Sequence, residues 1–295
     1  MVAEHTQIEF SSADGVRNTL TIAEATKSDS NALILCLPAM GVPARKYDEL
    51  INSLASNGIS AASVDLRGIG NNSIRASRKC NFGYRHLVEY DLPAAIECLL
   101  KHYPSKKLIL LGHSLGGQIA TLHLTQNLKN IEGLILTASC SVYYKGWPIL
   151  SRWGLLFFTQ LASLITIIVG YFPGRKLGFG GREARGVMRD WAYNARSGNY
   201  ILSGSKINYQ PSAQQQHKLD QFPVLCISFA DDKFAPVAAS EQLLSKLNSL
   251  KVDRELIHGS DLGLALADHF NWLAKPQAIA DICQHWIKSA IQTSK

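Results

Sequence analysis

The residues best suited to chemistry in this sequence begin with a serine placed between two glycines. Residues 112–116 read Gly-His-Ser-Leu-Gly and directly follow the apolar run 108–111. A serine at a sharp turn from a strand to a helix has a strained backbone, and side chains two positions to either side of it would collide with their neighbours. The pattern indicates that Ser114 is a nucleophile at such a turn; an ordinary glycine-rich turn is the alternative.

A serine hydroxyl is a weak nucleophile, so it needs a base, and the base needs an orienting acid. Asp231 and Asp232 come just after the apolar run 224–229. Asp232 is the preferred acid, although one of the two carboxylates could instead cap the helix that follows. His258 and His269 both follow the last predicted strand. His269 is the preferred base, because the loop before the final helix can fold back over the edge of a sheet.

The reaction also needs N–H donors for the negative charge that develops on the substrate oxygen. The backbone N–H of Leu115, the residue after the serine, is the first expected donor. The second is expected from the loop at residues 38–42, where Met40 is preferred and Ala39 is the alternative. His113, next to the serine, is predicted to line the substrate pocket.

The elements that must position these groups follow from runs of apolar residues. Strand-like and helix-like stretches alternate along most of the chain, which predicts a mostly parallel sheet with helices on both faces. Functional groups collect at the carboxyl ends of parallel strands, where Ser114 falls. We predict strands at 19–23, 32–37, 61–66, 108–111, 133–137, 224–229 and 254–257, and helices at 44–57, 85–103 (with Pro93 at a break or in a first turn), 116–128, 237–247 and 276–290.

The alternation stops between residues 142 and 219, a segment that we call the insertion. We expect residues 1–141 and 220–295 to form one core domain, interrupted by this largely helical insertion as a cap. The insertion holds 13 of the 25 aromatic residues and ten basic residues against two acidic ones, while the remainder of the chain is about neutral. A mobile aromatic cap would exclude water and favour an apolar acyl chain, so Trp147 and Phe158 are predicted to line the substrate pocket. Aromatic rings that only attach the cap to the core are the alternative.

One stretch of the insertion, residues 154–172, has 19 residues and no charge. The preferred interpretation is a helix packed on the core. The next is a peripheral contact with a membrane surface, which the basic flanks and Trp153 would suit. A spanning helix is the least favoured interpretation, because it would divide one sheet between the two sides of a membrane. The basic charge could also recognise an anionic substrate head; a solvated face is the simpler explanation.

The remaining composition narrows the class of protein. The six cysteines are scattered without a Cys-x-x-Cys pair, and three lie in apolar runs, which predicts free thiols, no structural zinc and a cytoplasmic location. Residues 1–15 lack a basic region followed by an apolar core, so no signal peptide is expected. No motif indicates nucleic-acid binding, no metal or cofactor is expected, and the oligomeric state is not predicted.

The serine turn, the order Ser…Asp…His and the interrupting insertion together resemble the α/β-hydrolase superfamily over nearly the whole chain. Within it the sequence is similar to predicted bacterial hydrolases near the serine-aminopeptidase-like and monoacylglycerol-lipase-like branch. It departs from many relatives in having Pro38-Ala39 where they have His-Gly, and it lacks the HGGG run of hormone-sensitive-lipase-like esterases. Serine at the turn argues against the aspartate-dependent epoxide hydrolases and dehalogenases. The closer likeness lies in residues 38–42, 65–70, 170–174, 230–236 and 260–270.

The resemblance implies an α/β-hydrolase fold and a cofactor-independent serine hydrolase. Ser114 would attack an acyl carbonyl, His269 would act as base and then acid, and Asp232 would orient the histidine. The expected partner is a small-molecule carboxylic ester with an apolar acyl chain. Thioesters are the closest competing substrates, followed by peptides and amides. An acyltransferase with the same acyl-enzyme and a non-catalytic binding scaffold are the alternatives to a hydrolase.

Overall fold

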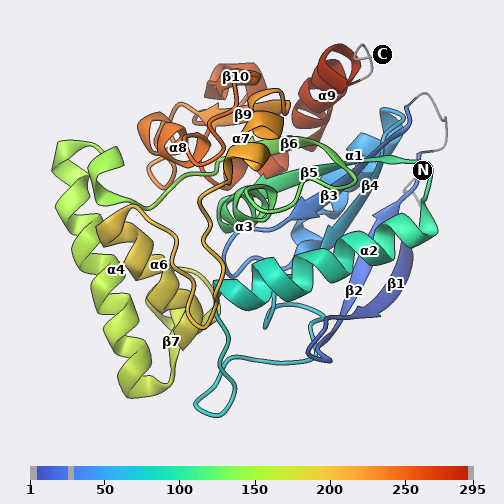
Figure 1. The fold of residues 1–295 in the computed structure, drawn as a ribbon. Helices are drawn as coiled ribbons and strands as arrows, with labels where there is room; N and C mark the ends of the chain where they lie inside the picture. Colours follow the sequence, from blue (N-terminus) through green and yellow to red (C-terminus); the bar gives the residue numbers. More distant parts are fainter. Residues whose placement is uncertain (1–4, 26–29, 292–295) are drawn as a thin grey trace.

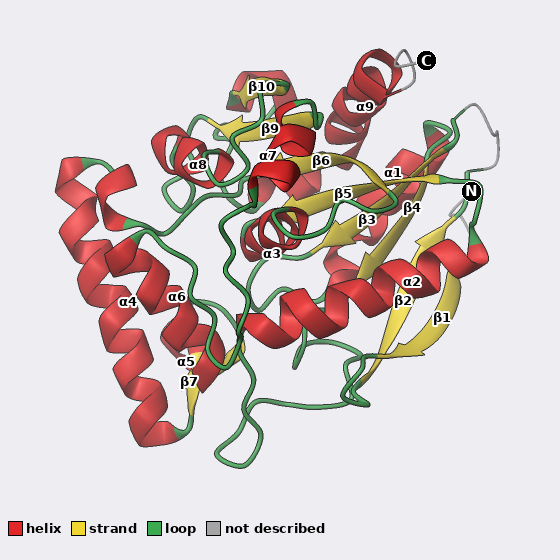
Figure 2. Cartoon of the chain, viewed as in Figure 1, coloured by secondary structure: helices red, strands yellow, loops and turns green. Residues whose placement is uncertain are grey.

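A single eight-stranded sheet organises the chain, for which a computed structural model describes residues 5–25 and 30–291 (Figures 1 and 2). The strand order is β1-β2-β4-β3-β5-β6-β9-β10. Strand β2 runs antiparallel to β1 and to β4, and the other neighbours are parallel. The predicted mostly parallel sheet is therefore confirmed. The strands are β1 (Thr6–Ser11), β2 (Arg17–Ala23), β3 (Ala32–Leu37), β4 (Ser60–Val64), β5 (Lys107–His113), β6 (Ile131–Thr137), β9 (Val224–Phe229) and β10 (Val252–Ile257).

Helices cover both faces of the sheet, because its central strands are apolar on both sides. In β3 all six side chains are buried, and successive ones enter different cores. Leu33 and Leu35 pack towards α2, α3 and α8, whereas Ile34 and Cys36 pack towards α1 and α9. These helices are α1 (Asp48–Ser56), α2 (Leu92–His102), α3 (Leu115–Leu124), α8 (Val237–Leu244) and α9 (Pro276–Trp286).

Two details of the core differ from the sequence-based expectation or refine it. Strand β1 was not predicted, since its residues are mostly exposed at the sheet edge and carry no apolar run. Pro93 lies in the first turn of α2, where an N–H has no intrahelical partner, and a π-helical segment precedes it.

The remaining helical elements are short. The 3-10 helices span Ala44–Tyr47, Tyr144–Gly146, Gly259–Leu262 and Asn271–Ala274, and the π-helical segments span His86–Asp91 and Ile287–Ile291.

The insertion lies beyond one end of the sheet, where α4 and α6 run side by side at the left of Figure 1. By length and composition α4 could cross a membrane. One of its faces is nevertheless buried, through Thr159, Ala162 and Thr166, and α4 packs against α6. The segment between β6 and β9 contains α4 (Ile149–Val169), β7 (Tyr171–Pro173), α5 (Gly174–Leu177), β8 (Arg182–Ala184), α6 (Arg185–Ser197) and α7 (Ala213–Asp220).

Candidate active site

Ser114 occupies the turn between β5 and α3, at the carboxyl end of a central strand. Its backbone has φ 53° and ψ −115°, a conformation that costs a non-glycine residue free energy. A Cβ atom on Gly112 would lie 2.3 Å from the Cα of Gly117, and one on Gly116 would lie 2.1 Å from the carbonyl oxygen of Leu37. Both flanking glycines are therefore required by close backbone approach, and the turn holds the serine side chain out of the sheet.

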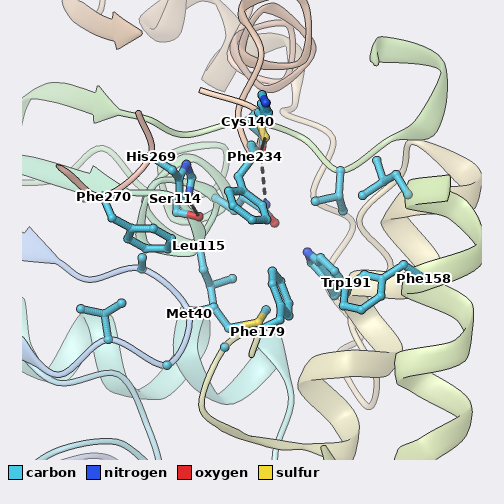
Figure 3. Close-up of a pocket in the computed structure, with 18 of the residues that line it drawn as sticks. Met40, Ser114, Leu115, Cys140, Phe158, Phe179, Trp191, Phe234, His269 and Phe270 are labelled. Atoms are coloured by element: carbon cyan, nitrogen blue, oxygen red, sulfur yellow. Dashed lines mark hydrogen bonds between the residues drawn. The ribbon is translucent and has the colours of Figure 1, made fainter. Parts of the chain in front are cut away.

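Ser114 is the first of three hydrogen-bonded side chains. Its Oγ lies 3.0 Å from Nε2 of His269, and Nδ1 of His269 lies 2.9 Å from Oδ2 of Asp232 (Figure 3 draws the first contact). The other carboxylate oxygen of Asp232 accepts the backbone N–H groups of Phe234, at 2.7 Å, and Ala235, at 2.8 Å. The carboxylate accepts the proton on Nδ1, which leaves Nε2 free to accept the serine proton.

The two alternative residues have other contacts. Asp231 accepts the backbone N–H of Ala267 at 2.9 Å and donates its own N–H to the carbonyl of Ala267 at 3.0 Å, so it ties the acid loop to the loop that carries the histidine. His258 is exposed, and its backbone N–H donates to Oδ2 of Asp261 at 2.8 Å. Neither residue touches Ser114, and the structure brings together only the preferred acid and base.

The backbone donors beside Ser114 differ in their availability. The N–H of Leu115 is the first of α3, where helices leave N–H groups unpaired. The N–H of Ala39 donates to Oη of Tyr47 at 3.0 Å and is occupied. Within the described residues no hydrogen bond from the N–H of Met40 is found, and Met40 lines the same cavity as Ser114 and Leu115 (Figure 3).

His113 does not line the substrate pocket, so that prediction is wrong. It is the last residue of β5 and its side chain is fully buried in the core beneath α1, 2.6 Å from Oη of Tyr47. Since Oη already accepts the N–H of Ala39, its own proton is donated to Nδ1 of His113. Burial, together with the charge of His269, holds the pKa of His113 well below its usual range, so the ring is neutral. The centroid of the His113 ring lies 5.0 Å from that of the His269 ring, so the buried histidine packs against the proposed base.

A cavity of about 470 Å³ opens in front of Ser114 and His269, with the insertion as its far wall (Figure 3). Trp147 and Phe158, the two predicted aromatic residues, both line it. Phe179, also in the insertion, has its ring stacked on that of Trp191 at 5.5 Å and is met edge-on by the ring of Phe158 at 5.1 Å. The result is an aromatic pocket large enough for an acyl chain.

Four aromatic residues of this pocket were missed as site residues by the sequence analysis. Two of them could have been found, because each lies within two positions of a residue of the hydrogen-bonded trio: Phe234 lies two positions after Asp232, and Phe270 is next to His269. The others, Phe179 and Trp191, have no local signal, since only the folding of the insertion turns them towards the serine.

The pocket is almost without charge. Lys233 is the only lysine, arginine, aspartate or glutamate among its described lining residues. Within the same described part of the chain, no group of three histidine, cysteine or acidic side chains is placed to hold a metal ion. The arrangement fits a neutral, apolar molecule whose reactive carbon reaches Ser114.

Comparison with known proteins identifies a family and a fold for the chain. Residues 28–176, just over half of the chain, match the family described as serine aminopeptidase, S33. The chain is similar in structure to an esterase of Pyrococcus furiosus, with TM-score 0.62, 15% identity and coverage of 98% of this chain and 92% of that one. It is also similar to an esterase of Exiguobacterium antarcticum, with TM-score 0.59, 15% identity and coverage of 95% and 99%. The α/β hydrolase GrgF of a Penicillium species matches with TM-score 0.63, 14% identity and coverage of 98% and 99%. At these identities the solved structures confirm the predicted α/β-hydrolase fold.

Proposed function

The chain belongs to the S33 serine aminopeptidase family, within the α/β-hydrolase superfamily, and is therefore a hydrolase; we propose that it cleaves carboxylic esters with apolar acyl groups. One observation carries the proposal. Ser114, His269 and Asp232 form a continuous hydrogen-bonded chain that opens into an aromatic cavity with a single charged lining residue, Lys233. The chain activates a nucleophile, and the cavity suits an acyl tail.

Acylation starts with attack of the Ser114 oxygen on the ester carbonyl carbon. The serine proton passes to Nε2 of His269, and Asp232 stabilises the imidazolium that forms. The carbonyl oxygen becomes negative and accepts the N–H groups of Leu115 and Met40. The tetrahedral intermediate then collapses, the C–O bond to the alcohol breaks, and His269 returns its proton to the departing oxygen.

Deacylation repeats these steps with water as the nucleophile. His269 takes a proton from the water as it attacks the acyl carbon, and the same two N–H groups hold the oxyanion. The carboxylic acid leaves as Ser114 regains its proton from the imidazolium. An acceptor alcohol in place of water would make the protein an acyltransferase, and a thioester in place of the ester would use the same groups.

The cavity favours an ester over the N-terminal residue of a peptide. An aminopeptidase must hold the positive α-amino group of its substrate, and a carboxylate is the usual partner for such a charge. No aspartate or glutamate is found among the described residues that line the cavity, and Lys233 would repel an ammonium group. A neutral ester avoids this repulsion.

The insertion acts in this proposal as a cap, with residues 1–141 and 220–295 as the hydrolase core. Its aromatic side chains Trp147, Phe158 and Trp191 contribute the wall that faces the serine. We place the protein in the cytoplasm, which its six free cysteines suit, because an oxidising compartment favours disulfides.

Labelling with a fluorophosphonate probe tests the proposal. Wild type is expected to form a covalent adduct, and Ser114→Ala is expected to form none, while Ser245→Ala, at an exposed serine after α8, labels like wild type. Turnover of p-nitrophenyl esters from acetyl to palmitoyl then measures the acyl preference. Folded wild-type protein that neither labels nor turns over any ester would contradict the proposal and favour a binding scaffold.

A further inference from the structure

The outer face of α4 carries a continuous row of large apolar side chains. Each of the six is between 40% and 100% exposed. Their spacing of three and four residues places them within an arc of about 80° on a helix with 3.6 residues per turn. So continuous an apolar surface is rare on a monomer in water and indicates a docking face. We call the row the apolar stripe; it consists of Leu150, Trp153, Phe157, Leu161, Leu164 and Ile168.

The opposite face of α4 is fixed to the rest of the insertion. Thr159, Ala162 and Thr166 are buried there, and Nε2 of Gln160 donates to the carbonyl of Ala192 on α6 at 2.9 Å. Figure 1 shows the two helices side by side at the edge of the molecule. A helix held in this way can lie on a membrane with its outer face, but it could cross one only by losing these contacts.

The charges around α4 are positive. Both acidic residues of the insertion, Glu183 and Asp190, are buried, so its exposed charges are all cations. At the carboxyl end of the helix Arg78 donates to the carbonyl oxygens of Ile168, at 2.9 Å, and Val169, at 3.1 Å. At the boundary between α4 and α6, the exposed Arg196 of α6 donates to Oε1 of Gln160 at 3.1 Å. The apolar stripe is thus bordered by groups that attract anions.

The amino end of α4 combines aromatic rings with a cation. The ring of Trp153 lies 5.4 Å from that of Tyr144, and Nζ of Lys145 lies 5.9 Å from the centre of the Tyr144 ring. Tryptophan and tyrosine beside a cation suit the boundary between lipid headgroups and acyl chains. Trp153 is also the only exposed tryptophan of the five in the chain, which makes it a natural probe of this face.

From the stripe and its charged border we infer that α4 docks on a bilayer that carries anionic lipid headgroups. The apolar stripe lies at the acyl boundary, and the cations of α4's neighbours contact the headgroups. A second copy of the chain fits this face less well. Two insertions, each with ten basic and two acidic residues, would then face one another, and their like charges would repel.

Docking on a bilayer would also orient the cavity. The inner side of the first half of α4 lines it through Gly154, Leu155 and Phe158, so one helix carries both the docking face and part of the pocket. The cavity would then lie next to the bilayer surface, where an ester held in the bilayer could enter it. This consequence rests on the proposed function, whereas the docking itself does not.

The test measures binding with Ser114→Ala, so that failure of docking and failure of catalysis are distinguished. Protein is floated with vesicles of phosphatidylcholine alone or of equal parts phosphatidylcholine and phosphatidylglycerol, at low and high salt. We expect binding to the mixed vesicles, at least about tenfold weaker binding to the neutral ones, and a loss of binding with salt. Tryptophan emission should shift to the blue on binding, and Trp153→Phe should remove the shift.

Double variants with matched controls test whether binding depends on the apolar stripe and its charged border rather than on the overall hydrophobicity or charge of the protein. Phe157→Glu with Ile168→Glu is expected to abolish flotation, whereas Leu250→Glu with Leu256→Glu, exposed apolar positions outside the insertion, should float like the parent. Arg175 and Lys176 are exposed cations of α5, the short helix that follows α4 and β7, and Arg175→Glu with Lys176→Glu should weaken binding to the mixed vesicles by roughly tenfold or more. The matched control for charge is Lys101→Glu with Lys129→Glu, which changes net charge equally at exposed positions elsewhere.

Two results would overturn the inference, with folding of each variant checked by its melting temperature. The first is that the Ser114→Ala protein floats with neither kind of vesicle, or that the stripe variant Phe157→Glu with Ile168→Glu floats like its control. The second is a dimer in light scattering that the stripe variant dissociates, without any vesicle binding; that result would assign the face to a second copy of the chain.

Discussion

The two walls of the cavity are built by different physics. The sheet wall is held by directional hydrogen bonds: Ser114, His269 and Asp232 are joined at 2.9–3.0 Å, and Tyr47 connects the loop of Ala39 to His113. The insertion wall is mainly an apolar surface, in which rings pack against each other. Proton transfer fails when atoms move by about 1 Å, but an apolar pocket tolerates repacking. Substitutions in the sheet wall should therefore lower the activity towards every substrate. Substitutions in the insertion wall should lower it by an amount that depends on the size of the acyl group.

The largest expected effect lies in the sheet wall. His269→Ala and Asp232→Asn should each lower kcat by on the order of 10⁴-fold, because one removes the base and the other its orienting charge. The loss should be equal for acetyl and long-chain p-nitrophenyl esters. His258→Ala, at an exposed histidine, is the control and should retain activity. A loss that depends on acyl length would show that these residues bind the substrate and do not drive the chemistry.

Tyr47→Phe tests the hydrogen bonds below the catalytic groups. The variant leaves the buried N–H of Ala39 and Nδ1 of His113 without their partner, which should lower the free energy of unfolding by about 2–4 kcal/mol. Activity should fall for all esters, because Ala39 precedes the proposed donor Met40. Urea unfolding and kcat measure the two effects.

The control for this change is Tyr103→Phe, which removes a hydroxyl that contacts the exposed Glu24 at 2.6 Å. It should change stability by less than about 0.5 kcal/mol. If both phenylalanine variants are equally stable, the buried tyrosine does not support the sheet wall.

Glu183 makes a polar contact where the two walls meet, since it accepts the N–H of Gly181 at 2.9 Å. The loop there is tight, because a Cβ on Gly41 would lie 2.1 Å from the nitrogen of Gly181. Burial raises the pKa of Glu183 from its ordinary 4.5 to about 7, so the folded state favours the protonated form. The contribution of Glu183 to the free energy of unfolding is therefore fully present below pH 4.5. It decreases by about 3 kcal/mol as the pH rises to about 7.

Urea unfolding of wild type and Glu183→Gln across this range measures the effect. Glutamine keeps an acceptor oxygen for Gly181 but cannot ionise, so the variant should lose less stability than wild type as the pH rises. Parallel curves for the two proteins would show that Glu183 is not responsible for a pH-sensitive contact.

The smallest effect is expected from the insertion wall. Phe158→Ala should lower kcat/KM for long acyl esters by roughly tenfold, since it removes apolar contact area, and should leave acetyl esters nearly unchanged. Ile201→Ala, an exposed apolar position of the insertion outside the cavity, is the control. Equal losses for short and long esters would mean that the ring acts on the geometry of the sheet wall.

Much of the sheet could be predicted, because buried parallel strands are continuous apolar runs. Strands β3, β5 and β9 fall at predicted places, whereas β1 was missed, since an exposed edge strand lacks such a run. The direction of His113 was also missed. A single position of strand register decides whether a side chain faces a pocket or a core, and adjacency to Ser114 does not reveal it.

The sequence by itself determined the parts whose cause is local. The glycines around Ser114, the alternation of strands and helices, and the uneven charge of the insertion are all legible along the chain. Only the tertiary structure decided which carboxylate and which histidine meet the serine, since Ser114 and His269 are 155 positions apart. It also decided that Tyr47 lies under His113 and that α4 faces solvent with its apolar side. Such contacts depend on how distant elements pack, and no periodicity within one element encodes that.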